Sequence, residues 1–110
     1  MTKEQIISII KKAAERHGFT TCKYTMTRLI EIKEPGDTHY LNFFIQESFP
    51  EGIDWSKREV TMNLHFRASL ASMGGEPTPE DLLKAAEIIK AGALLVQELD
   101  AMNLSYTERH

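Results

Sequence analysis

The chain has one cysteine, Cys22, among its 110 residues. A single thiol excludes an internal disulfide and leaves no second cysteine for a CxxC redox or zinc motif, which favours a reducing compartment. The apolar run near the N-terminus is short and has charges on both sides, unlike that of a signal peptide. No stretch approaches the roughly 20 apolar residues of a membrane-spanning helix. We therefore expect a cytoplasmic protein with no membrane partner.

Motifs that carry chemistry are also lacking. The sequence has no HxH, HExxH or GxSxG pattern, and His39 and His65 are expected on adjacent strands but on opposite faces. The glycine-rich residues 73–78 precede a helix, an arrangement that can hold a phosphate, but three neighbouring acidic residues would repel an anion. We expect no catalytic residue, no cofactor and no metal.

Two segments have the apolar spacing of helices. The first begins after Thr2, which forms a capping box with Gln5, and ends before Gly18, which suits the left-handed position after a helix. The second should span residues 78–102, with Pro79 in its first turn. The apolar stripe of the first helix is Ile6, Ile10, Ala13, Ala14 and His17.

Between these helices the apolar residues alternate with polar ones, which predicts three strands at residues 20–33, 38–49 and 60–70. A turn at residues 34–37 should need a positive φ at Gly36. The third strand alternates most clearly. Its inward residues should be Val60, Met62, Leu64, Phe66, Ala68 and Leu70.

The predicted fold is α+β, in the order α-β-β-β-α, with an antiparallel three-stranded meander and both helices packed on its one apolar face. Residues 1–104 should form a single domain, and residues 105–110 a polar C-terminal tail that frays. The other face of the sheet would stay open. It could present Tyr40, His65 and Arg67 as a surface site.

Nucleic acid binding is not expected, although the double-stranded RNA-binding domain has the same order of elements. That domain places lysines at the start of its second helix to contact phosphates. Here the corresponding positions hold Pro79, Glu80 and Asp81. The net charge of −3 gives no long-range attraction to a polyanion either.

The second half of the last helix lacks a polar stripe. Residues 91–96 are Ala-Gly-Ala-Leu-Leu-Val, which is apolar around the whole circumference of the helix. Such a helix has to be covered on all sides. A chain this short has few other elements to cover both sides of the helix. We therefore expect a homodimer or a larger ring. Its interface should contain Ala91, Gly92, Leu94 and Leu95.

The order of the predicted elements gives the chain a particular layout. It consists of a short N-terminal helix, a strand of sequence REVTMNLHFR at residues 58–67 and a final helix that contains EDLLKAAEII at residues 80–89. This layout resembles the small tail-completion and head–tail joining proteins of tailed bacteriophages. The resemblance implies ring-shaped oligomers and function through surfaces, with no catalytic residue to carry over.

Two classes of function follow. The first is a non-enzymatic, self-associating structural, assembly or interaction protein, possibly a phage or prophage tail or neck component, with itself and other proteins as partners. The alternative is a small-molecule-binding or enzymatic α+β domain whose site forms between subunits and uses Tyr40, His65 and Arg67. A deep pocket with convergent polar groups would favour the alternative.

Overall fold

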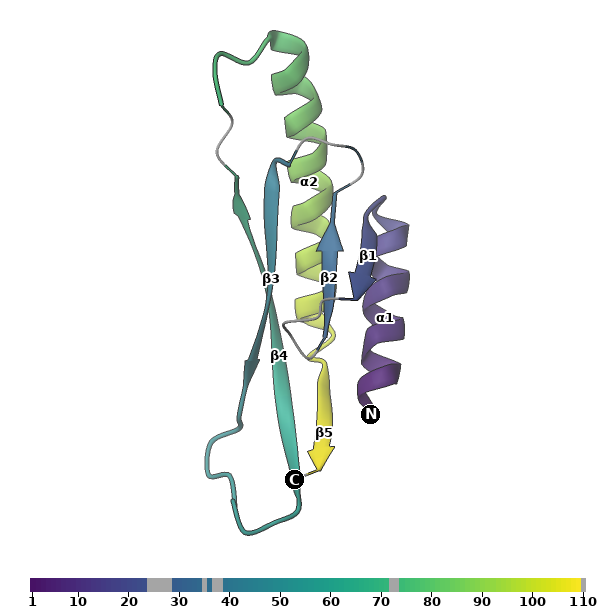
Figure 1. The fold of residues 1–110 in the computed structure, drawn as a ribbon, viewed down its shortest axis with the longest axis vertical. Helices are drawn as coiled ribbons and strands as arrows, with labels where there is room; N and C mark the ends of the chain where they lie inside the picture. Colours follow the sequence, from purple (N-terminus) through teal and green to yellow (C-terminus); the bar gives the residue numbers. More distant parts are fainter. Residues whose placement is uncertain (24–28, 35, 37–38, 72–73, 110) are drawn as a thin grey trace.

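The computed structural model describes residues 1–23, 29–34, 36, 39–71 and 74–109. The mixed α+β class expected from the sequence is confirmed, because a three-stranded antiparallel sheet is covered by two helices (Figure 1). The elements are α1 (Lys3–Arg16), β1 (Thr20–Lys23), β2 (Ile30–Lys33), β3 (Leu41–Ser48), β4 (Glu59–Leu70), α2 (Pro79–Ala101) and β5 (Ser105–Arg109).

The three-stranded sheet has the order β3-β4-β5, so β4 is its central strand. In the register Leu41 lies opposite Leu70, and Asn63 lies opposite both Ser48 and Ser105. The first strand expected from the sequence is not part of this sheet. Its described residues form β1 and β2, a separate antiparallel pair, while residues 24–28 lie outside the described part of the chain.

Strand β5 pairs with the edge of β4 that lies away from β3, where the sequence predicted no strand. Asn103 has a φ of +51°, which reverses the chain directly after α2, and the Leu64 amide then donates to the Leu104 carbonyl at 3.0 Å. Tyr106 is 1% exposed. The expectation of a frayed tail is therefore wrong for residues 105–109, because their alternating side chains pair with β4 and bury a tyrosine.

The core lies between the inward face of β4 and the two helices. Val60, Met62, Leu64 and Phe66 are buried as predicted, in one cluster with residues of both helices and β5. The same face does not continue to the end of the strand, since Ala68 is exposed and Leu70 is 68% exposed. Residues from the other elements in the cluster include Ile6, Ile10, Leu95, Leu99 and Tyr106.

The C-terminal end of α1 is tied to α2 by an ion-pair cluster. Arg16 Nη2 and His17 Nε2 each lie 2.6 Å from a different carboxylate oxygen of Glu98. The hydrogen bonds from Arg16 and His17 lower the pKa of Glu98 below its ordinary value. His17 thus ends the helix, as the sequence indicated, and its partner comes from the other helix.

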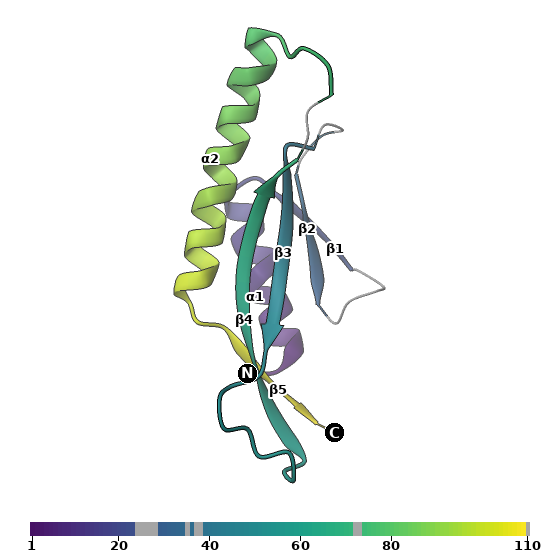
Figure 2. The same ribbon diagram turned by 90° about the vertical axis from the view of Figure 1, so that its left-hand side faces the viewer.

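The molecule is elongated, with extents of 56 × 26 × 23 Å and a radius of gyration of 16.1 Å. A compact chain of this length would have a radius of about 13 Å. The difference arises because the first turns of α2 project past one end of the sheet, and the loop between β3 and β4 projects past the other (Figures 1 and 2). Within the described residues, neither helix combines the length and apolar character needed to cross a membrane.

Candidate functional site

The four residues predicted for a subunit interface do not share one environment. Leu95 is fully buried in the core and Gly92 is buried against β3, so neither can reach a second subunit. Ala91 is half-buried, and Leu94 is 46% exposed. The premise that this chain cannot cover residues 91–96 is wrong for Gly92 and Leu95, because β3 and the opposite helix lie on that side of α2.

A different stripe of α2 combines exposed and half-buried apolar residues, and we call it the apolar seam. It consists of Leu82, Ala86, Ile89, Ala93 and Val96, which are all exposed or half-buried. Their spacing alternates between four and three residues, as in helices that pack along a partner helix. The C-terminal half of the seam borders a groove of about 380 Å³ between α2 and β4. Leu70 on β4 forms the other wall of this groove.

The structure does not assemble the surface site predicted from Tyr40, His65 and Arg67. His65 and Arg67 are both exposed and lie two residues apart on β4, but Tyr40 is only 5% exposed. Tyr40 precedes β3, and its backbone is held by the carboxylate of Glu34. His65 Nδ1 instead lies 4.0 Å from the carboxylate of Asp100 on α2.

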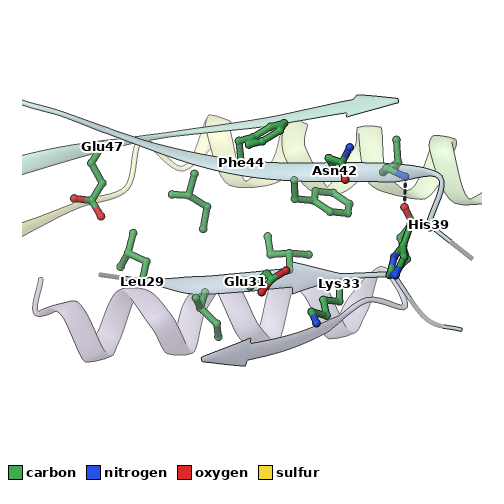
Figure 3. Close-up of a pocket in the computed structure, with 13 residues that line it drawn as sticks. Leu29, Glu31, Lys33, His39, Asn42, Phe44 and Glu47 are labelled. Atoms are coloured by element: carbon green, nitrogen blue, oxygen red, sulfur yellow. Dashed lines mark hydrogen bonds between the residues drawn. The ribbon is translucent and has the colours of Figure 1, made fainter. Parts of the chain in front are cut away.

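A second hollow lies between β2 and β3, and we call it the β2–β3 cleft (Figure 3). Its volume is about 670 Å³. Apolar side chains line most of it, among them Ile32 on β2, Phe43 and Ile45 on β3, and Leu29 just before β2. Sequence reasoning missed this cleft, because it treated residues 20–33 and 38–49 as neighbouring strands of one sheet.

Glu34 holds the closed end of this cleft. Its side chain is only 4% exposed, and its two oxygens accept the Tyr40 amide at 2.9 and 3.0 Å. The Leu41 amide donates to the same carboxylate. Gly36 has a φ of +90°, which is the positive value expected in this turn, while Pro35 and Asp37 lie outside the described residues. The carboxylate therefore fixes where β3 begins relative to β2.

The polar groups of the cleft do not converge on one point. Glu47 and His39 lie at opposite ends of it in Figure 3, with Glu31 between them. Glu47 accepts a hydrogen bond from the Tyr106 hydroxyl at 3.0 Å, and the Cys22 thiol lies 3.7 Å from Glu31. In the described part of the chain, no three His, Cys, Asp or Glu side chains are placed to hold a metal ion.

Comparison with known proteins finds no matching family model, curated protein or solved structure. Functional inference for this chain therefore rests on its own two features, the apolar seam of α2 and the β2–β3 cleft. The seam presents apolar side chains at the surface, and the cleft presents strand edges together with charged side chains.

Proposed function

We propose that this protein is a non-enzymatic structural or assembly component that works by associating with copies of itself. The observation that carries the proposal is the apolar seam of α2, together with Leu70 on β4. Large contiguous apolar surfaces are uncommon on soluble monomers and typically mark an interface. The partner we propose is the same seam of a second copy.

Two properties of the seam favour a second helix as its partner. Its four–three spacing keeps one line of apolar side chains facing a neighbouring helix over several turns. Ala86 and Ala93 alternate with the larger Leu82, Ile89 and Val96, so the side chains of two helices can interdigitate at close distance. A two-fold pair of such helices buries both copies of the seam with one kind of contact.

A ring needs a second, different surface on each subunit, because a two-fold contact alone closes at a dimer. Phe49 and Trp55 provide exposed apolar area in the loop between β3 and β4, with ring centroids 4.8 Å apart. This loop lies at the opposite end of the molecule from the start of α2 (Figure 1). The resemblance to phage tail-completion and head–tail joining proteins supports a ring, and we extend the proposal to a subunit of this kind.

The proposal is tested by sedimentation equilibrium at protein concentrations up to tens of micromolar. Ala93→Glu places a charge in the middle of the seam at an exposed position, so it should break the seam-to-seam contact and lower the mass of the assembly. Ala101→Glu makes the same change at an exposed position away from the seam on the same helix, and it should leave the assembly intact. A wild-type protein that is monomeric under these conditions would contradict the proposal.

A further inference from the structure

The edges of β2 and β3 that face each other carry no strand pairing. Among the described residues β2 pairs only with β1, and β3 pairs only with β4. No backbone hydrogen bond joins β2 to β3 in the described part of the chain. The two strands nevertheless run side by side, and the β2–β3 cleft lies between them (Figures 1 and 3).

The pairing of β3 with β4 shows which backbone groups of β3 have no partner on β4. The Ala71 amide donates to the Tyr40 carbonyl at 2.8 Å, which makes this a hydrogen-bonded pair of the antiparallel ladder. Hydrogen-bonded and non-hydrogen-bonded pairs alternate along an antiparallel ladder. The next hydrogen-bonded pairs in this register are therefore Asn42 with Ser69 and Phe44 with Arg67. The intervening residues Phe43 and Ile45 therefore direct their N–H and C=O groups away from β4.

We propose that the β2–β3 cleft binds an extended peptide segment, which adds as a strand beside β3. Unpaired strand edges recognise extended peptides through main-chain hydrogen bonds, and side-chain contacts then select the sequence. A cleft of about 670 Å³ is within the range of sites that hold a ligand, about 300–1,000 Å³. This inference does not depend on self-association through α2.

The charges of the cleft define the chemistry of the segment. Its lining contains the carboxylates Glu31, Glu34 and Glu47 against the single cation Lys33. Glu34 is occupied by backbone amides, which leaves Glu31 and Glu47 to attract positive charge. The apolar lining favours apolar side chains at alternate positions of an extended chain. The fitting occupant is a segment in which apolar residues alternate with lysine or arginine.

The probe is a fluorescein-labelled peptide of sequence TVKVKVT, titrated with the full chain and followed by fluorescence anisotropy. Its matched controls are TVEVEVT, which reverses the charge, and TVKVKVT with N-methylated backbone amides, which cannot pair with a strand edge. The lysine peptide should bind saturably. Both controls should bind about tenfold more weakly or worse, since each loses several hydrogen bonds or meets like charge.

The position of the bound peptide is tested by the backbone amide signals of the protein in NMR spectra. Addition of the lysine peptide should shift the signals of Phe43, Ile45 and the β2 residues more than those of α2. Glu31→Lys should weaken binding about two- to fivefold, as expected for one exposed ion pair, whereas Glu87→Lys on α2 should not. If Glu31→Lys does not fold, the peptide series and the amide map of the wild-type protein still decide the question.

Three results would overturn the proposal. The first is a lack of saturable binding by the lysine peptide, and the second is equal binding of its N-methylated form. The third is a shift of the cleft amides with protein concentration and without peptide, because a second copy would then be the occupant. The two proposals are tested separately. Ala93→Glu should lose self-association through the apolar seam and should still bind the peptide in the β2–β3 cleft.

Discussion

Gly92 lies on the side of α2 that faces the Leu41 and Phe43 side chains of β3. A Cβ atom built on this glycine would overlap Leu41 Cδ1 and would lie 3.4 Å from Phe43 Cζ. The sequence indicated that a glycine here permits close approach, and the approaching group was expected to be a second subunit. The structure shows that it is the chain's own strand, so the small size of Gly92 serves the packing of the subunit itself.

Gly92→Val should lower the free energy of unfolding by about 2–3 kcal/mol, because the added methyl groups overlap Leu41 in a filled core. Ala93→Val adds bulk at the next position, which is exposed, and should change stability by about 0.5 kcal/mol or less. Urea unfolding of both variants at a concentration where the chain is monomeric gives the comparison. Equal losses would mean that Gly92 is not packed against β3.

Strand β5 is the element that completes the sheet. It pairs only with the first half of β4, from Glu59 to Asn63, yet it brings one of the most buried large side chains into the core. Tyr106 also donates its hydroxyl to Glu47 on β3, so this residue spans the width of the sheet. The last residues of the chain are thus part of the folded domain, and the domain extends beyond the expected boundary at residue 104.

Tyr106→Ala should destabilise the fold by about 3–5 kcal/mol, in the range of other buried aromatic truncations. The neighbouring Thr107→Ala, on the exposed side of the same strand, should cost well under 1 kcal/mol. Thermal or urea unfolding measures both. A small effect of Tyr106→Ala would show that the C-terminal residues leave the sheet in solution, as the sequence alone predicted.

At the scale of the whole molecule, a cluster of charged side chains ties the end of α1 to α2. Arg16 and His17 at the end of α1 share the carboxylate of Glu98, far away in the sequence. These side chains are partly exposed, so salt should screen the interaction. The ionised form of Glu98 is the form that accepts the hydrogen bonds from Arg16 and His17 most strongly.

The pKa of Glu98 is lowered from its ordinary value of 4.5 in the folded chain, chiefly by the hydrogen bonds from Arg16 and His17. A lowered carboxyl pKa stabilises the fold above the unfolded-state pKa, and this contribution is lost as the pH falls below about 4.5. Glu98→Gln should therefore be less stable than the wild type at pH 7, and the difference should shrink toward pH 3.

Urea midpoints at both pH values measure this effect, and Glu87→Gln on the same helix is the control at an exposed glutamate. The control should show a smaller difference from the wild type, with little dependence on pH. A difference between Glu98→Gln and the wild type that persists unchanged at pH 3 would show that the charge of Glu98 does not hold α1 against α2.

Local patterns in the sequence determined the elements whose signals are contained within a few residues. The capping box at Thr2, the proline at position 79 and the alternation from Val60 to Phe66 predicted both helices and the strand β4 with its buried face. These signals suffice because backbone caps and side-chain periodicity depend on near neighbours in the chain.

Only the tertiary structure decided which surfaces are buried or paired inside the subunit. It placed Gly92 and Leu95 in the core, moved Tyr40 away from the open face and brought β5 into the sheet. It also placed β2 and β3 in separate sheets, so that a cleft separates two segments that alternation had assigned to one meander. The reason is that burial and strand pairing depend on residues far apart in the sequence, and a period of two or 3.6 residues specifies a face but not what covers it.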